Sequence, residues 1–563
     1  MVADKKNKEK LDLAKNYFLS NNFYGALELF KELADDDAKN SEIKLLFGIT
    51  LLRSESYQEA IRVLSEAIKI QPDIHLANHA LGSALFMIED YQGALSAFNR
   101  EIEINPKYPD SYCDKGYALN ELGSYQEAFQ AGSLAIKLDP IYADSYNVIA
   151  ASLNQLDRYD EAMKNALRAI EIDSSKANYF YTQGNIFLNK GNLQDALNSF
   201  KRALELNPSY EEASFNKSLI HLRLLDFEKA WRLYENRFST YPKESRNKFI
   251  TKNFFDKNFD SLGRAFIFKE QGIGDQMLFA SIFHEIDKKE KVIYLEVNEK
   301  LLPVFNRSFK NLKFVTAKNY PKSDSYETTF GIASLPSFFR KNVNSFNIER
   351  NSFLKSDKNK TSTFRQRLLS DAPLNKICGI SWRSKNETIG KYKTLDLINL
   401  KEILGLQGIS FVNLQYNPPL EELKLFEAEH KVCIKNFSDV DLFNDVDSLC
   451  SLVDACDFVV TISNINAHVA GALGKKTFLL VPFSKGRHWY WHEKMSRSLW
   501  YPSVEIFSQI ETREWSVPIN KIKEKKENSK LILVTVPSMG ALKYLTYSLW
   551  IYQEKLLVKI ILS

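Results

Sequence analysis

The chain is 563 residues long, which is too long for one hydrophobic core and indicates about three or four domains. Hydrophobic residues make up 44% of it and charged residues 26%, as in an ordinary globular protein. The formal net charge of +5 is small for this length and does not indicate nucleic-acid binding, for which a concentrated basic face is typical.

The first residues, MVADKKNKEKLD, are polar and lack the apolar stretch of a secretory signal. The five cysteines are scattered, without a CxxC pair or histidines at zinc spacing, so we interpret them as reduced thiols. Both features predict a cytoplasmic protein.

Small residues recur every 34 positions in the first part of the chain, and an alanine follows each of them twelve residues later. The two series are Ala14, Gly48, Gly82, Gly116, Ala150, Gly184 and Ser218, and Ala26, Ala60, Ala94, Ala128, Ala162, Ala196 and Ala230. Prolines another twelve residues on, such as Pro72 and Pro106, end the second helix of a unit. The pattern resembles the tetratricopeptide repeat, and it predicts seven such helix-turn-helix units over residues 1–243.

Repeats of this kind stack into a superhelix with a concave groove. Polar side chains from repeats four and five are expected to face this groove: Asp110, Asn120, Glu121, Asp144, Asn147, Asn154 and Gln155. One interpretation is a binding surface for an extended peptide or a partner protein. The other is a solvated face without a ligand.

The 34-residue period stops near Pro242, and a polar linker is expected over residues 244–262. Short apolar runs then alternate with helical segments, which indicates βαβ units and parallel sheets. We expect one Rossmann-like lobe with its link over residues 263–375 and a second over residues 376–520, facing each other across a cleft. The expected strands are Ala265–Lys269, Val292–Val297, Phe314–Ala317, Ile377–Trp382, Ile409–Leu414, Val432–Lys435, Phe458–Ile462 and Thr477–Val481.

A glycine-containing turn follows the first of these strands. Gly272 and Gly274 permit a tight turn, and the helix that begins near Asp275 offers its N-terminus to a ligand. Asp275 has two interpretations: a general base toward a hydroxyl acceptor, or a helix N-cap.

The segment SNINAHVAGALGKK, which follows strand Phe458–Ile462, suits an anionic diphosphate at a helix N-terminus. Candidate donor-binding residues in it are Ser463, Asn464, Asn466, His468 and Gly471. For His468 the alternative is a core histidine with a satisfied hydrogen bond.

Two other strand ends point to the same cleft, because Arg383 follows Ile377–Trp382 and Gln415 follows Ile409–Leu414. Arg383 suits a leaving phosphate, and Gln415 a base or a ribose. The aromatic stretch around Trp489 favours packing over ligand stacking. The two DxD triplets that begin at Asp439 and Asp445 are interpreted as solvated loop carboxylates, so we expect no obligatory metal.

The segments KEQGIGDQMLFAS, GISWRSKN, ISFVNLQY, TISNINAHVAGALGKK and SLWYPSVEIF occur in this order over residues 263–510. This part of the chain resembles the glycosyltransferase-like domain appended to bacterial tetratricopeptide-repeat proteins, which is related to the heptosyltransferases and is glycosyltransferase family 9-like. The resemblance implies a GT-B fold of two Rossmann-like lobes, a nucleotide-diphosphate sugar held by the second lobe, and no metal. It also implies Asp275 as the general base and Arg383 as the cation against the diphosphate. Ser463 replaces the aspartate of the family's donor loop, so the donor sugar stays open.

The expected fold class is therefore an α-helical repeat superhelix followed by a GT-B α/β region. We expect a metal-independent inverting glycosyltransferase that moves a sugar to a hydroxyl of a protein, peptide or glycan acceptor, with the repeats recruiting an acceptor or a protein partner. The nucleotide sugar is a substrate, so no cofactor is implied. The alternative is a non-catalytic repeat scaffold with a degenerate glycosyltransferase domain.

The apolar but interrupted tail, residues 521–563, has no uncharged stretch long enough for a transmembrane helix. It leaves open a peripheral membrane contact, a docking helix or a segment foreign to the domain.

Overall fold

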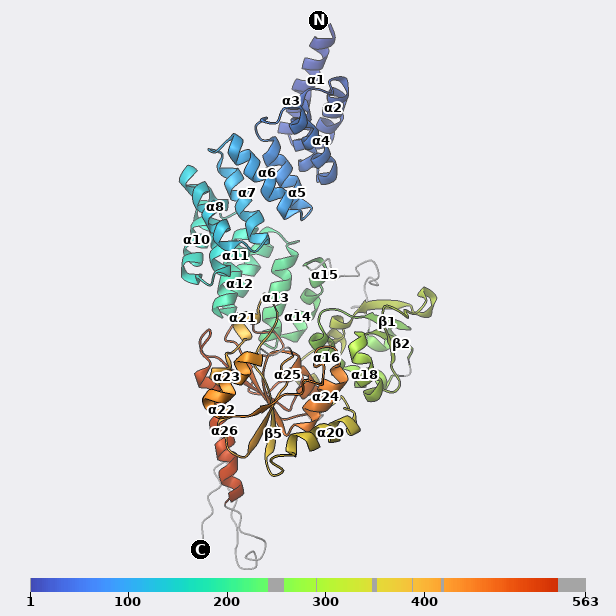
Figure 1. Ribbon diagram of the computed structural model, residues 1–563. Coiled ribbons are helices and arrows are strands. Elements are labelled where there is room, and N and C mark those ends of the chain that lie inside the picture. The colour runs from blue at the N-terminus through green and yellow to red at the C-terminus, as the bar shows by residue number, and fades with distance from the viewer. Residues whose placement is uncertain are drawn as a thin grey trace, which may run out of the picture. The chain divides into compact units, whose positions relative to one another are not determined.

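The computed structural model describes residues 2–240, 258–289, 291–346, 352–386, 388–416 and 420–534. The chain divides into two compact units, residues 1–220 and residues 221–563 (Figure 1). The expected end of the repeats near Pro242 and residues 535–563 of the expected tail lie outside the described residues.

The N-terminal unit is a succession of helix pairs, in which consecutive helices pack side by side (Figure 1). Its helices are α1 (Val2–Leu19), α2 (Phe23–Asp36), α3 (Ser41–Arg53), α4 (Tyr57–Ile70), α5 (Ala77–Met87), α6 (Tyr91–Ile104), α7 (Pro109–Glu121), α8 (Tyr125–Leu138), α9 (Ala143–Gln155), α10 (Tyr159–Ile172), α11 (Ala177–Lys190) and α12 (Leu193–Leu206). Helix α13 (Glu211–Arg223) crosses into the second unit.

Small residues make this helix packing possible. The alanines of the second series in this unit, from Ala26 to Ala196, are fully buried. A Cβ atom on Gly48 would lie 2.5 Å from Cγ of Leu64, and one on Gly184 would lie 2.5 Å from Cε1 of Phe200. The 34-residue pattern therefore marks the positions where the paired helices cross most closely.

The C-terminal unit begins with helices α14 (Phe227–Tyr234) and α15 (Arg237–Thr240) and continues with a four-stranded parallel sheet. The strand order is β3-β2-β1-β4, formed by β1 (Ala265–Phe268), β2 (Ile293–Glu296), β3 (Lys313–Val315) and β4 (Thr328–Gly331). Its helices are α16 (Ile273–Ala280), α17 (Phe283–Asp287), α18 (Leu302–Ser308) and α19 (Pro336–Phe339). Strand β4 was not predicted, because Thr328 and Thr329 interrupt an apolar run.

A six-stranded parallel sheet follows, with the order β10-β9-β8-β5-β6-β7. Its strands are β5 (Lys376–Ser381), β6 (Ile409–Asn413), β7 (Ile434–Lys435), β8 (Phe458–Ile462), β9 (Thr477–Val481) and β10 (Val504–Ser508). Strands β5, β6, β8 and β9 match the expected positions to within one residue, β7 is two residues shorter, and β10 was not predicted. The helices are α20 (Lys358–Leu369), α21 (Gly390–Lys393), α22 (Lys401–Leu404), α23 (Leu420–His430), α24 (Val446–Ala455), α25 (Ile465–Ala472) and α26 (Ser516–Val534).

Helix α26 belongs to the core of the second sheet, because Ile519 and Ile522 are buried with Phe458 and Phe478. The first part of the expected tail is thus helical and packed. None of the helices in the described part of the chain combines the length and apolarity needed to cross a bilayer.

Candidate functional site

The turn between β1 and α16 carries Asp275 at its helical end. The residue with positive φ is Gln271, at 58°, whereas Gly272 has an ordinary φ of −80°. The left-handed conformation in this turn is thus at Gln271 and not at Gly272, and the role of the two glycines in permitting the turn stays a prediction. The backbone N–H of Gly272 donates a hydrogen bond to Oδ2 of Asp275 over 3.3 Å, so this carboxylate also caps the first turn of the helix.

Gly274 lies against the ring of His468. A Cβ atom at position 274 would come within 3.0 Å of Cδ2 and 3.3 Å of Nε2 of that imidazole. Helix α16 of the four-stranded sheet and helix α25 of the six-stranded sheet consequently approach each other at these two residues. A larger side chain at position 274 would push the helices apart.

The polar residues after β8 build the start of α25. Asn464 is the N-cap, and its Oδ1 accepts the N–H of Asn466 over 3.0 Å. Its Nδ2 donates to Oγ of Ser381 over 3.1 Å, which ties the end of β8 to the end of β5. Ser463 is buried and accepts a hydrogen bond of 2.8 Å from Nε1 of Trp491.

His468 is buried, and its Nδ1 lies 2.9 Å from the hydroxyl of Tyr501. Burial, followed by the nearby charge of Lys393, lowers the pKa of His468 to about 3. The imidazole ring is therefore neutral at physiological pH. It can form hydrogen bonds, but it does not supply a positive charge. The sequence left two interpretations of His468 open, a binding-site residue and a core histidine with a satisfied hydrogen bond. The structure agrees with the second and also places the ring at the edge of a cavity.

This cavity has a volume of about 360 Å³. It lies beyond the carboxyl ends of β1, β5 and β8, where the strand order of each sheet reverses, and ligands of open α/β sheets bind at such points. The predicted residues Gly274, Asp275, Ser463, Asn464 and His468 all line it. Its other lining residues are Ile273, Lys300, Ser384, Lys385, Asn386, Lys393, Tyr416, Leu442, Phe443, Val446, Leu449, Ile465, His488 and Tyr490.

Three lysines give the cavity wall positive charge. Lys393 is buried, and its Nζ lies 3.2 Å from Nε2 of His488. Burial lowers the pKa of Lys393 to about 8, although the negative charge of Asp275 acts in the opposite direction. Lys300 lies over the ring of Phe443 and Lys385 over the ring of Tyr416. Lys393 and Lys300 were missed because isolated lysines in polar sequence carry no signal.

Arg383 does not line the cavity, contrary to the expectation that it faces the diphosphate. Its guanidinium donates a 2.7 Å hydrogen bond to Glu422 of helix α23. Gln415 is buried and its Oε1 accepts the N–H of Arg383 over 2.9 Å, so it supports the strand end and does not line this cavity. Lys385, two residues after Arg383, and Lys393 of helix α21 line the cavity instead.

Asn466 and Gly471 also lie away from the cavity. Asn466 is fully buried and donates to the carbonyl of Leu414 over 3.1 Å. A Cβ atom on Gly471 would lie 2.5 Å from Cγ of Tyr501, so the glycine allows this tyrosine to reach His468. Both residues support side chains and backbone next to the cavity, and neither lines it.

A buried ion cluster supports the turn that carries Asp275. Arg237 of helix α15 donates hydrogen bonds of 2.9 and 3.0 Å to Glu270, at the start of the turn. Glu270 also accepts the N–H of Ala333 over 3.1 Å. The hydroxyl of Tyr234 accepts a 3.3 Å hydrogen bond from Gln271. Side chains of helices α14 and α15 thereby hold the turn between β1 and α16 in place.

Carboxylates of both acidic triplets are held by other groups of the protein, and the expectation of solvated loop carboxylates is wrong for Asp447, which is buried in α24. Asp439 pairs with Arg367, and Asp447 pairs with Arg307. Asp445 caps helix α24 through the N–H of Ser448. Within the described ranges, no three His, Cys, Asp or Glu side chains gather as a metal-binding group. Trp489 and Trp491 are buried in packing, as the sequence favoured, whereas Tyr490 is buried and also lines the cavity.

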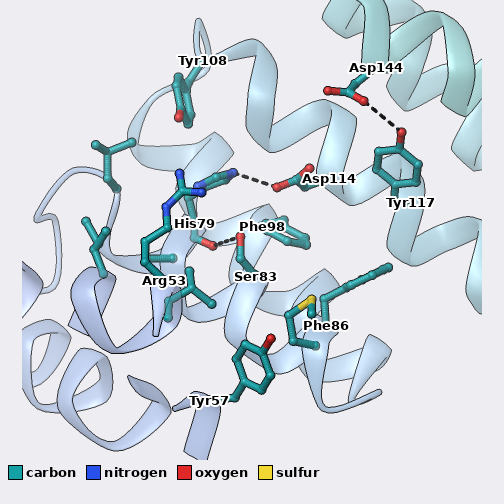
Figure 2. A pocket seen from close by; sticks show the side chains of 15 residues that line it. Arg53, Tyr57, His79, Ser83, Phe86, Phe98, Tyr108, Asp114, Tyr117 and Asp144 are labelled. Carbon is teal, nitrogen blue, oxygen red and sulfur yellow. Dashed lines mark hydrogen bonds and ion pairs between the residues drawn. The ribbon is translucent and has the colours of Figure 1, made fainter. Parts of the chain in front are cut away.

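Most of the expected polar groove residues are hydrogen-bonded to other residues of the repeats. Asp110 accepts the hydroxyl of Tyr142 over 2.8 Å, and Asn120 accepts that of Ser152 over 2.9 Å. Asn147 and Asn154 are buried. A cavity of about 670 Å³ in this unit lies instead along α3, α5 and α7, and of the predicted groove residues only Asp144 lines it (Figure 2).

Family models of the tetratricopeptide repeat match residues 11–73 and 45–111, residues 97–130, residues 143–176 and residues 177–210. The N-terminal part of the chain, across about 220 residues, therefore consists of tetratricopeptide repeats. Such repeats suggest a role in protein interaction.

Protein FlbA of Caulobacter vibrioides is 27% identical over 330 residues, which are 55% of this chain and 54% of that protein. The chain thus spans about half the length of this curated relative. Among solved structures, MamA is 27% identical and matches 29% of this chain and 94% of its own, with a TM-score of 0.27. YrrB, a TPR protein with an unusual peptide-binding site, is 20% identical and matches 34% of this chain and 99% of its own, with a TM-score of 0.28.

Proposed function

We propose that the C-terminal unit is a GT-B glycosyltransferase that transfers a sugar from a nucleotide-diphosphate donor to a hydroxyl acceptor. The cavity at the carboxyl ends of both sheets carries this proposal, because it combines a carboxylate, three lysines and a polar helix start. In the same proposal the repeats bind the acceptor or another protein partner.

The donor diphosphate fits the lysine side of the cavity. Lys300, Lys385 and Lys393 supply positive charge, and Asn464 presents the start of α25 beside them. Fixed cations and helix N-termini stabilise phosphate oxygens before and after bond cleavage. The ring of Tyr416, beside Phe443 with centroids 5.3 Å apart, offers a face for the base or the sugar.

Asp275 fits the role of general base. The acceptor hydroxyl attacks the anomeric carbon and gives its proton to the Asp275 carboxylate. The bond from the anomeric carbon to the diphosphate oxygen breaks, and its electron pair leaves with the nucleotide diphosphate toward the lysines. A single displacement of this kind inverts the anomeric configuration.

Replacing Asp275 by Asn tests the role of this residue, since the amide oxygen can still accept the N–H of Gly272. We expect nucleotide release from a productive sugar donor to fall at least about a hundredfold, with donor affinity nearly unchanged. A variant with wild-type turnover would remove Asp275 from the mechanism.

A second candidate is a repeat-bearing scaffold without turnover. The ion pair between Arg383 and Glu422 favours it, because the cation that the family resemblance assigns to the diphosphate is engaged elsewhere. Donor-dependent turnover that disappears in Asp275→Asn while the fold is intact would eliminate this candidate.

A further inference from the structure

The N-terminal unit has a ligand-sized cavity of its own, of about 670 Å³, on the inner helices α3, α5 and α7. Its two ends differ in chemistry. Figure 2 shows Asp114, Tyr117 and Asp144 toward one end, with Tyr57 and Phe86 toward the other. A side chain that is apolar along its stem and polar at its tip would match both ends.

The apolar end is open to solvent. Tyr57 and Phe86 lie at this end (Figure 2). Leu52 and Met87 also belong to the cavity lining, and Met87 has 52% of its surface exposed. Exposed methionine and aromatic side chains adapt to the stems of long side chains. This end therefore suits methylene groups of an incoming residue.

The acidic end presents two oriented carboxylates. Oδ2 of Asp114 lies 3.0 Å from Nε2 of His79, and Oδ1 of Asp144 accepts hydroxyl hydrogen bonds from Tyr179 over 3.0 Å and Tyr117 over 3.4 Å. Neither carboxylate forms an ion pair with a Lys or Arg within the described residues. His79 thus holds the carboxylate of Asp114 in place, and the two tyrosines hold that of Asp144.

Further carboxylates surround this end of the cavity. The pKa of Tyr108, which lines it, is raised to about 12, first by burial and then by the charges of Asp110, Asp114 and Glu101. Glu101 is fully buried and accepts the backbone N–H of Leu76 over 2.9 Å. The positive side chain that lines the cavity, Arg53, comes from the last turn of α3.

We infer that this cavity binds the side chain of a lysine or arginine in an extended segment of a partner protein. The stem lies along Leu52 and Phe86, and the cationic head lies between Asp114 and Asp144. A basic segment is favoured over an acidic one by charge complementarity, because the carboxylates of an acidic segment would be repelled by Asp114 and Asp144. The inference names the partner chemistry for the repeats and rests on the protein-binding part of the proposed function.

Fluorescence anisotropy of the full chain with labelled nonapeptides tests it. The peptides share a Gly-Ser-Leu background and differ only in a central Arg, Lys, Gln or Glu. We expect the Arg and Lys peptides to bind about tenfold more tightly than the Gln peptide, because one charge-assisted hydrogen bond contributes about this difference in affinity. Asp114→Asn should remove this preference, and Asp144→Asn is a second variant should the first fail to fold.

Asp195→Asn is the matched control, because Asp195 is exposed on α12 outside the cavity. This variant should bind the Arg peptide like the wild type. Equal binding of the Arg and Gln peptides, or a preference for Glu, would overturn the inference but leave the repeats a protein-binding role. Binding of none of the peptides would count against both.

Discussion

Gly274 and His468 touch across the two sheets of the C-terminal unit: a Cβ atom on the glycine would lie 3.0 Å from Cδ2 of the imidazole. The ring cannot move away easily, because Nδ1 lies 2.9 Å from the hydroxyl of the buried Tyr501. This contact sets the separation of α16 and α25, and with it the width of the proposed donor cavity.

Gly274→Ala should therefore lower the free energy of unfolding of the C-terminal unit by about 1–2 kcal/mol, since overpacking outweighs the gain in helix propensity. Urea unfolding followed by tryptophan fluorescence measures this unit alone, because all seven tryptophans follow residue 220. Gly405→Ala is the control, as its Cβ atom would meet only the carbonyl of Lys401 at an ordinary 3.5 Å. Equal effects of the two substitutions would contradict the close contact.

Arg237 should be essential for the stability of the turn that carries Asp275. Arg237→Met leaves the buried carboxylate of Glu270 unpaired, and breaking a buried ion pair in this way costs about 3–5 kcal/mol. The exposed pair of Arg264 and Glu327 gives the comparison, since Arg264→Met should cost less than about 1 kcal/mol. The same urea titration distinguishes them, and similar costs would show that the buried cluster has no special role.

Lys393 should make binding of a nucleotide diphosphate dependent on pH. Its pKa is lowered to about 8, so the ammonium that attracts the anion is present below this pH and lost above it. Phosphate oxygens with a second pKa near 6 are already ionised above about pH 7. We expect the affinity to fall between pH 7 and pH 9.5, as measured by calorimetry.

In Lys393→Gln the affinity should be about tenfold weaker at pH 7 and nearly constant up to pH 9.5. His468 does not contribute to this slope, because its pKa of about 3 keeps it neutral throughout. A wild-type slope retained in the variant would assign the titration to another group.

Lys385 and Arg383 should behave differently although they are separated by one residue. Lys385 lines the cavity, whereas Arg383 is paired with Glu422. Lys385→Gln should weaken nucleotide-diphosphate binding about five- to tenfold without changing the unfolding midpoint. Arg383→Gln should lower the unfolding midpoint and leave the affinity for the nucleotide diphosphate nearly unchanged. A loss of affinity in this variant would show that Arg383 does contribute to the ligand site.

Periodicity predicted the repeats well, because the same small residues must recur wherever two helices cross. The parallel strands were predictable where a buried run is continuously apolar, as in β8 (Phe458–Ile462). Strand β4 was not, since hydrogen bonding to β1 rather than its own composition makes Thr328–Gly331 a strand.

The candidate site was predictable only in part. Asp275, Asn464 and His468 follow strand ends, and strand ends of parallel sheets meet at one edge. Arg383 was misplaced because a sequence does not reveal that Glu422, on a later helix, will pair with it. Lys393 was missed for the opposite reason, since its burial depends on the fold of distant segments.

Isothermal titration of the full chain with UDP, GDP, ADP and CMP sugars is the most direct test of the proposed donor site. We predict saturable binding of at least one donor, which is lost when Lys385 and Lys393 are both replaced by Gln. Binding of none of these donors, or undiminished binding by the double variant, would contradict a donor site between Asp275 and His468.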